Sequence, residues 1–156
     1  MLDIYVDADA CPVKQEVYKV ADRCGLRVIV VSNTPIYVPT GQAGIRNIAV
    51  GPGIDVADDW IAENICTGDI CITADIPLAS RCLMKGASAL GPRGKPFSDD
   101  SIGDVLATRE LMSSLRESGR ISGGPPPMAG KDRSRFLDAL DQIIQKIRRE
   151  MSEEIT

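Results

Sequence analysis

The most constraining feature of this sequence is a pattern that occurs twice: an apolar run, then carboxylates, then a proline. The first copy is the run at 2–6 with Asp7, Asp9 and Pro12, and the second is the run at 70–73 with Asp75 and Pro77. A proline suits the first turn of a helix, where its missing N–H would be unpaired anyway. The pattern therefore predicts two buried strands that deliver acids to their C-terminal ends, where open α/β sheets bind ligands.

Strands and helices alternate along most of the chain. Further apolar runs predict strands at 26–31, 45–50 and 87–90, and helices are expected at about 12–24, 55–66, 76–85 and 101–117. This alternation is typical of βαβ units. It predicts an α/β fold with a mainly parallel sheet of about five strands.

The chain after residue 121 differs in composition from the part before it. Residues 1–121 are expected to form the α/β domain, and the glycine- and proline-rich stretch at 122–133 is predicted to be a linker. Residues 134–150 carry apolar side chains at helical spacing, from Phe136 and Leu140 to Ile144 and Ile147. They predict a C-terminal amphipathic helix.

Composition excludes several classes of protein. The chain has no histidine, which removes Ser-His-Asp hydrolysis, Cys-His proteolysis and histidine-ligated zinc. Its five cysteines form no C-x-x-C pair and predict packed thiols in a reducing compartment, Cys11 among them. No apolar run is long enough to span a membrane and no signal peptide is visible, so a cytoplasmic protein without membrane partners is expected.

The net charge of −4 is weak evidence against nucleic-acid binding, because the basic residues are unevenly distributed. Many of them follow Gly86, and the loop at 91–97 presents Arg93 and Lys95. Clustered cations of this kind can face phosphate groups. The loop lacks the spacing of a P-loop.

The acids after the first strand have two interpretations. Asp7 caps no predicted helix, which favours a role as a direct metal ligand. Asp9 is either a second ligand or the N-cap of the following helix. Carboxylate oxygens are the ligands that Mg²⁺ and Mn²⁺ prefer.

A second acidic group opens the helix expected at 55–66. Asp55, Asp58 and Asp59 are spaced at i, i+3 and i+4, so they share a helix face. Asp55 is predicted to cap that helix together with Asp58, in the manner of a capping box. Asp58 and Asp59 are candidate metal ligands, since like charges on one face need compensation. Trp60 beside them is expected to be a core residue.

Asp75 and a later acidic group each have two possible roles. Asp75 is either the N-cap of the helix that contains Pro77 or a metal ligand close to Asp7. Asp99, Asp100 and Asp104 form either a solvated first helical turn or an additional part of the metal site.

Three motifs together resemble one family: D-A-D-A-C-P-V-K at 7–14, T-A-D-I-P-L-A at 73–79 and G-P-R-G-K-P-F at 91–97. The chain is similar over nearly its whole length to the YaiI/YqxD family of bacterial proteins, which is grouped with PIN-like nuclease domains. The resemblance implies a three-layer PIN-like fold that holds Mg²⁺ or Mn²⁺ with acids.

The residues that match the PIN pattern are Asp7, Asp58 in D-D-W-I-A, and Asp75 in T-A-D. The chain departs from the PIN pattern at the acid on the intermediate helix, which is commonly Glu in PIN-like domains. No Glu stands between Glu16 and Glu63 here, so Asp59 or the Asp99 and Asp100 pair would have to take its place.

The leading hypothesis is a metal-dependent phosphodiesterase that acts on RNA or single-stranded nucleic acid. Asp7, Asp58 and Asp75 would be catalytic and Arg93 and Lys95 would hold substrate phosphates. One alternative is a haloacid-dehalogenase-like phosphatase, with Asp7 as nucleophile and Asp9 as acid/base. Another is a non-catalytic module of the same fold that binds nucleic acid or protein.

Overall fold

Apolar strands occupy the centre of the molecule. The computed structural model describes residues 2–8, 11–39, 44–53, 55–98 and 128–155. The inner strands β1 (Asp3–Asp7), β2 (Arg27–Ser32) and β4 (Ile70–Ile72) are buried over almost their whole length, whereas β3 (Ile45–Ala49) is half-exposed. Strands buried on both faces are typical of parallel sheets covered by helices.

These strands and β5 (Ser88–Leu90) form one five-stranded sheet in the order β3-β2-β1-β4-β5. Every pair of neighbouring strands is parallel, so all five strands finish at the same end, here called the carboxyl end of the sheet. The predicted mainly parallel α/β sheet is confirmed, and it is parallel throughout.

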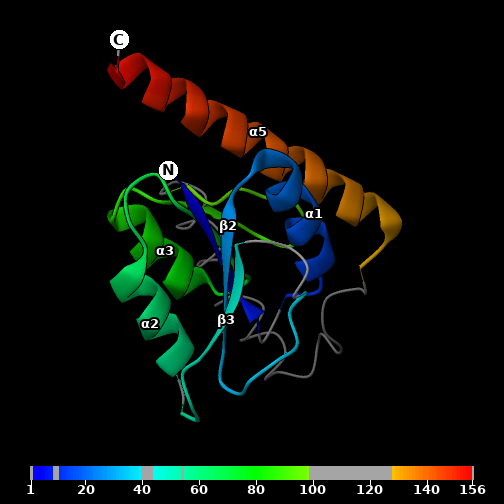
Figure 1. The fold of residues 1–156 in the computed structure, drawn as a ribbon, viewed down its shortest axis with the longest axis vertical. Coiled ribbons are helices and arrows are strands. Elements are labelled where there is room, and N and C mark those ends of the chain that lie inside the picture. The colour runs from blue at the N-terminus through cyan, green and yellow to red at the C-terminus, as the bar shows by residue number, and fades with distance from the viewer. Residues whose placement is uncertain (1, 9–10, 40–43, 54, 99–127, 156) are drawn as a thin grey trace, which may run out of the picture.

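Helices cover both faces of the sheet and make three layers (Figure 1). Helix α1 (Lys14–Cys24) and helix α5 (Gly130–Ile155) pack together on one face, and α2 (Val56–Asn64) and α3 (Ile76–Met84) lie on the other. The expected three-layer α/β architecture is confirmed. No helix in the described part of the chain has both the length and the apolar character needed to cross a membrane.

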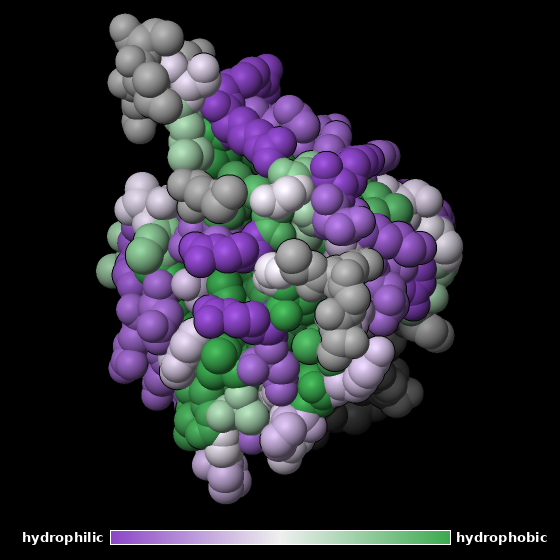
Figure 2. Space-filling model, viewed as in Figure 1, coloured by the Kyte–Doolittle hydropathy of each residue, from purple (hydrophilic) through white to green (hydrophobic). Residues whose placement is uncertain are grey.

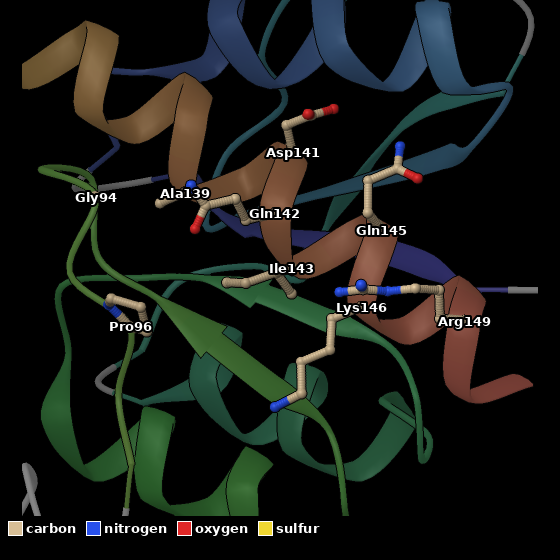
Figure 3. A pocket seen from close by; sticks show the side chains of 9 residues that line it. All are labelled: Gly94, Pro96, Ala139, Asp141, Gln142, Ile143, Gln145, Lys146 and Arg149. Atoms are coloured by element: carbon tan, nitrogen blue, oxygen red, sulfur yellow. The ribbon is translucent and has the colours of Figure 1, made fainter.

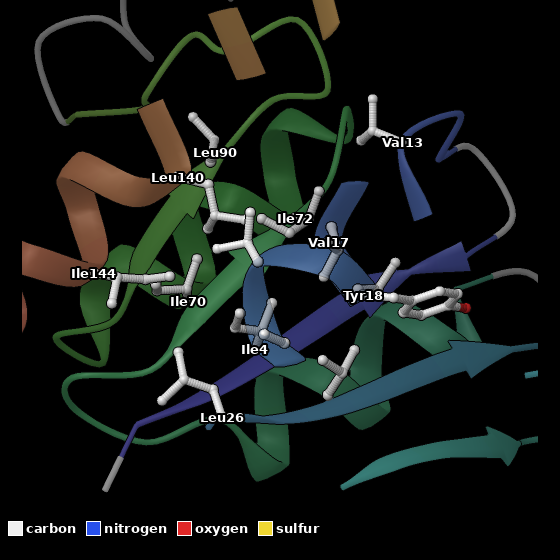
Figure 4. Packing of buried hydrophobic residues seen from close by; sticks show 14 of the residues in the cluster. Ile4, Val13, Val17, Tyr18, Leu26, Ile70, Ile72, Leu90, Leu140 and Ile144 are labelled. Atoms are coloured by element: carbon white, nitrogen blue, oxygen red, sulfur yellow. The ribbon is translucent and has the colours of Figure 1, made fainter. Parts of the chain in front are cut away.

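The alternation of side chains along the strands divides the core into two parts. Ile4 and Val6 of β1 point into the cluster under α1 and α5, where Leu140 and Ile144 of α5 join them (Figure 4). Tyr5, between them in the sequence, belongs to the cluster under α2 and α3. Each fully buried aliphatic side chain in such a core contributes about 1.5–3 kcal/mol.

The helix boundaries confirm some of the predicted signals and correct others. Gly25 ends α1 in the left-handed conformation, as expected, and Pro77 lies in the first turn of α3. The expectation that Pro12 occupies the first turn of α1 is wrong, because the N-cap of α1 is Val13. The prediction that the Asp55 side chain caps α2 is wrong, because Asp55 occupies the N-cap position without a side-chain cap hydrogen bond. Its φ of 65° is the left-handed conformation, whereas a capping residue normally has an extended backbone.

The C-terminal helix is longer than the predicted range of 134–150. It begins at Gly130, where the Asp132 carboxylate accepts a hydrogen bond from the Ala129 N–H at 2.9 Å, and it continues to Ile155. Residues 130–133 of the predicted linker at 122–133 therefore belong to this helix. The division into a domain at 1–121, a linker and a separate helix is otherwise still a prediction. The helix expected at 101–117 lies outside the described residues.

Three of the five predicted packed thiols are buried: Cys11, Cys71 and Cys82. Cys24 is half-buried, whereas Cys66 is exposed. Burial raises the pKa of the Cys11 thiol to about 11, which confirms a packed thiol and excludes a reactive thiolate at this position near neutral pH.

The basic loop at 91–97 approaches α5 closely at Gly94. A Cβ atom placed on Gly94 would lie 2.7 Å from the carbonyl carbon of Arg135, and the Gly94 φ is +89°. Gly51 has the same φ of +89° but nothing within 4 Å of its Cβ position. A comparison of substitutions at Gly94 and Gly51 therefore separates the effect of backbone conformation from that of the close approach to α5.

We predict that Gly94→Ala destabilises the protein much more than Gly51→Ala. Both substitutions force alanine into the left-handed region, at about 1–2 kcal/mol each. Only Gly94→Ala also displaces the loop from α5, which adds about 1–3 kcal/mol of overpacking. Denaturant unfolding of the two variants measures the difference, and equal losses would show that the loop and helix do not meet as described.

Candidate functional site

The strand order reverses direction between β1 and β4. From β1 the chain continues through α1 to β2 on one side, and from β4 it continues through α3 to β5 on the other. In open α/β sheets, such a reversal leaves a crevice outside the carboxyl ends of the two strands, and ligands bind there. Asp7 is the last residue of β1, and Thr73 and Asp75 follow β4, so these residues lie at that position.

Thr73 links the two strand ends. Val6 pairs with Ile72 in the sheet, which brings Asp7 level with Thr73. The Thr73 hydroxyl donates to Asp7 Oδ2 at 2.8 Å and accepts from the Asp75 N–H at 2.9 Å. Asp7 and Thr73 are both buried. This hydrogen bond satisfies one oxygen of the buried Asp7 carboxylate and fixes its orientation.

Sequence analysis did not identify Thr73 as a site residue. The signal that could have found it is a hydroxyl residue directly after a buried strand and two positions before an acid, within the T-A-D motif. Parallel pairing of the two strands then places that hydroxyl beside Asp7.

Asp75 has a structural role in addition to any functional one. Its Oδ1 accepts from the Leu78 N–H at 2.8 Å, so Asp75 is the N-cap of α3. The capping interpretation is therefore confirmed. A role in metal binding stays a prediction.

Asp58 reaches the same region from the first turn of α2. Burial, followed by the negative charges of Asp7, Asp75, Asp55 and Asp59, raises the Asp58 pKa from 3.8 to about 6. This shift shows that the structure brings Asp58 into electrostatic range of Asp7 and Asp75. We call these three residues the acidic cluster. They come from three separate segments of the chain.

Asp59 points toward a different partner. Its Oδ1 lies 2.7 Å from Arg81 Nη1, and both side chains are about half exposed. The pair joins α2 to α3 beside a small cavity of about 220 Å³, which Asp55, Asp58 and Asp75 also line. Because Arg81 already offsets its charge, Asp59 is less suited to hold a cation than Asp58. Asp9, Asp99, Asp100 and Asp104 lie outside the described residues. The N-cap interpretation of Asp9 is wrong, because Val13 occupies the N-cap position of α1.

The acidic cluster suits a hard divalent cation in the chemistry of its donors. All of them are carboxylate oxygens, which favour Mg²⁺ or Mn²⁺ over Zn²⁺. Within the described ranges, no three Asp, Glu, Cys or His side chains are close enough to form a ligand group as placed. Mg²⁺ is usually held by only one or two carboxylates, together with water and substrate phosphates. The residues therefore fit a cation with few protein ligands and do not fit a closed protein cage.

The two candidate phosphate ligands lie in the loop after β5. Arg93 Nη1 is 3.5 Å from Asp132 Oδ2 near the start of α5, whereas Lys95 is exposed. The loop begins at the carboxyl end of the sheet, because Leu90 is the last residue of β5. Lys95 is the more available of the two, and the role of either side chain in substrate binding stays a prediction.

A larger cavity of about 810 Å³ lies between this loop and α5, and no residue of the acidic cluster lines it. Gly94 and Pro96 form one wall, and polar side chains of α5 such as Gln142 and Lys146 form the other (Figure 3). Hydrophilic side chains cover the outer surface of α5 (Figure 2). This open groove has mixed apolar and polar walls and none of the converging carboxylates that mark the smaller cavity.

Trp60, predicted to be a core residue, is partly buried and packed against the core cluster under α2 and α3. Its ring centre lies 6.2 Å from that of Tyr5 at an angle of 47°. The tilted contact is a common aromatic arrangement and gives Trp60 a packing role.

These observations define an α/β protein with an acidic site at the switch point of a parallel sheet. The chain belongs to the family described as "Uncharacterized BCR, YaiI/YqxD family", whose model matches residues 5–146. The resemblance seen in the three motifs is thereby confirmed.

Two curated relatives match this chain over almost its whole length. The "UPF0178 protein" of Rhodospirillum rubrum is 56% identical over 148 residues, which cover 95% of this chain and 99% of the relative. A protein of the same description from Rhodopseudomonas palustris strain HaA2 is 59% identical over 146 residues, which cover 94% and 88%.

Among solved structures, the chain is similar to Rae1 (YacP) from Bacillus subtilis. The TM-score is 0.41 at 19% identity, over 88% of this chain and 96% of that one. These values are too low to carry a conclusion about activity.

We predict that Thr73→Val destabilises the protein by about 1–3 kcal/mol, whereas Thr73→Ser has little effect. Valine matches the shape of threonine but leaves the buried Asp7 carboxylate and the Asp75 N–H without the shared hydroxyl. Serine keeps that hydroxyl. Chemical denaturation of both variants measures the contrast, and equal stability of the valine and serine variants would show that the hydrogen bonds are not made.

We predict that Asp58→Asn stabilises the metal-free protein at pH 7 but not at pH 3.5. The pKa of Asp58 is higher in the folded than in the unfolded state, so ionisation of Asp58 lowers stability. This loss develops as the pH rises from about 4 to about 6 and is complete above that. The expected rise in Tm at pH 7 is on the order of 2–4 °C, because Asp58 is only half-buried and solvent screens part of the repulsion.

Asp59→Asn is the matched control, since it changes the next carboxylate on the same helix. Asp59 has Arg81 as a partner, so its removal should leave Tm unchanged or slightly lower at pH 7. A stabilisation by Asp59→Asn as large as that by Asp58→Asn would attribute the effect to general helix charge and not to the acidic cluster.

Proposed function

We propose that this protein is a metal-dependent phosphodiesterase that acts on RNA or single-stranded nucleic acid at the acidic cluster. The observation that carries the proposal is the convergence of Asp7, Asp58 and Asp75 at the switch point of the sheet. Carboxylates held in mutual range repel one another, as the raised pKa of Asp58 indicates. A bound cation would convert that repulsion into binding energy.

Asp7, Asp58 and Asp75 would hold Mg²⁺ or Mn²⁺, which neutralises developing charge on phosphate oxygens and activates water when bound. The residues around the cluster have separate tasks. Thr73 orients the Asp7 carboxylate through its hydrogen bond to Oδ2. The cap of α3 uses Asp75 Oδ1, which holds that side chain at the carboxyl end of the sheet.

Positive charge in the cluster would also change the protonation of Asp58. An opposite charge nearby favours the ionised form of a carboxyl group, so the Asp58 pKa should fall below 6 in the loaded protein. Lys95 and Arg93, in the loop that leaves the carboxyl end of β5, are the candidates to hold substrate phosphates. Asp132 competes for Arg93, which makes Lys95 the stronger candidate.

A non-catalytic module that binds nucleic acid is the second candidate function. Two carboxylates of the cluster already have protein partners, because Asp75 caps α3 and Asp7 accepts from Thr73. Acids retained only for these structural roles would need no metal. Metal binding and turnover therefore have to be measured separately.

We predict that Asp7→Asn abolishes Mg²⁺- or Mn²⁺-dependent cleavage of single-stranded RNA and spares RNA binding. The substitution removes a proposed metal ligand but no contact with substrate phosphates. A loss of turnover of at least about 100-fold is expected, on the scale of a missing electrostatic catalytic group. Cleavage by the parent protein should disappear with EDTA.

Asp3→Asn is the matched control, because Asp3 lies at the other end of β1. Asp3 pairs with Arg27, with both carboxylate oxygens at 2.9 Å from the guanidinium, and its loss should leave cleavage intact. If the parent protein binds metal and RNA but cleaves nothing, the non-catalytic module replaces the nuclease. Equal turnover by Asp7→Asn and the parent would exclude the acidic cluster as the site.

A further inference from the structure

Tyr37 differs from the other aromatic residues in its exposure to solvent. Its exposed fraction is 84%, whereas every other aromatic side chain is buried or half-buried: Tyr5, Tyr18, Trp60, Phe97 and Phe136. A ring exposed to this degree contributes little to the core. Exposed aromatic rings are, however, the usual platforms on which proteins stack unpaired bases.

The segment that carries Tyr37 is tied to the sheet by hydrogen bonds. The Ile36 N–H donates to Asn47 Oδ1 at 3.1 Å. Asn47 Nδ2 in turn donates to the Val30 carbonyl and to Ser32 Oγ, each at 2.9 Å. Ser32 Oγ donates to the Thr34 carbonyl at 2.6 Å. The path of the chain just before Tyr37 is therefore fixed by a side chain of β3.

Packing on either side of Tyr37 directs its ring outward. Ile36 and Val38 are half-buried against the core cluster under α1 and α5. Pro35 and Pro39 flank this short stretch and restrict its backbone. With both neighbours turned inward and the backbone restricted, the chain at Tyr37 already presents the ring to solvent, so the backbone would lose little conformational entropy when a ligand binds.

The Tyr37 segment runs along the α1 side of the sheet, level with the last residues of β2, because Ile36 bonds to Asn47 and Asn47 pairs with Val30. It follows β2, which is the direct neighbour of β1, and Asp7 pairs with Val31 near the end of β2. In Figure 1, the light-blue segment after β2 begins at the lower end of the molecule, where α2 also begins, and then rises beside the sheet. A strand bound at the acidic cluster could therefore extend toward Tyr37.

Basic side chains are present at the same end. Lys14 opens α1, and its Nζ donates to the Cys11 carbonyl at 3.2 Å. Arg133 Nη1 donates to the Pro12 carbonyl at 3.0 Å and lies 3.2 Å from Glu16 Oε1. Cations for the phosphates and an aromatic platform for a base are the two elements with which proteins bind single strands without reading their sequence.

We propose that Tyr37 stacks on an unpaired base of a single-stranded nucleic acid whose backbone passes the carboxyl end of the sheet. This inference rests on the proposed function and makes it more specific. Because the ring would contact a base and not a phosphate, it selects single strands over duplexes. Its contribution to binding requires no metal.

The test is binding of the full-length protein, in EDTA, to a labelled single-stranded oligoadenylate of about 12 nucleotides. An abasic strand of the same length and charge serves as the second probe. Tyr37→Ala should weaken binding of the oligoadenylate about tenfold and leave binding of the abasic strand unchanged. Tyr37→Trp should retain the affinity for the oligoadenylate. Fluorescence anisotropy measures both affinities.

Met84→Ala is the matched control, because Met84 is also 84% exposed but lies at the C-terminal end of α3. It should change neither affinity. If the parent binds the oligoadenylate and Tyr37→Ala binds it equally well, the stacking inference is overturned and the proposed function stands. If Tyr37→Ala weakens binding of both strands alike, Tyr37 does not contact a base. A parent protein that binds neither strand in EDTA overturns the inference, whereas the proposed function is decided by metal-dependent cleavage of RNA.

Discussion

The parallel pairing of β1 with β4 is the constraint on which the site depends. It joins two segments that are far apart in the sequence and aligns Val6 with Ile72. The two strands therefore end at the same level of the sheet. The carboxylate of Asp7 then meets the hydroxyl of Thr73, and Asp75 begins the next helix beside them. A shift in the register of either strand would separate these groups, because a strand that slips by one residue turns its side chains to the other face.

The acidic cluster combines structural and electrostatic roles in the same few side chains. Asp75 stabilises α3 by capping it, and Thr73 satisfies the buried Asp7. Asp58 has no comparable benefit, since burial and neighbouring charges make its ionised form unfavourable. It is therefore the residue of the cluster whose presence is hardest to explain by folding alone.

Much of the fold could be predicted from local patterns. Buried strands appeared as apolar runs, Gly25 marked the end of a helix, and Pro77 marked the beginning of another. The same reasoning failed at Asp55, because a capping sequence says nothing about φ, and the backbone there is left-handed. It also placed the start of α5 too late, because Gly130 is a poor helix former and the cap made by Asp132 was not recognised.

The position of the site could be predicted from the sequence, but the hydrogen-bond and ion-pair partners of its residues could not. Strand ends that carry acids indicate where a ligand binds, which is why Asp7 and Asp75 could be placed near each other. The pairing of Asp59 with Arg81 depends on how α2 packs on α3, and the sharing of the Thr73 hydroxyl depends on the sheet register. These are consequences of tertiary packing, which spacing along the sequence does not encode.

The most direct test of the account is a crystal structure of the protein with Mn²⁺, in which anomalous scattering locates the ion. The account predicts a peak at the carboxyl ends of β1 and β4, bound by Asp7 and by at least one of Asp58 and Asp75. Protein ligands are expected to be few, with water filling the remaining positions. Crystals that bind Mn²⁺ only elsewhere, with Asp7 and Asp58 unliganded at saturating metal, would contradict it.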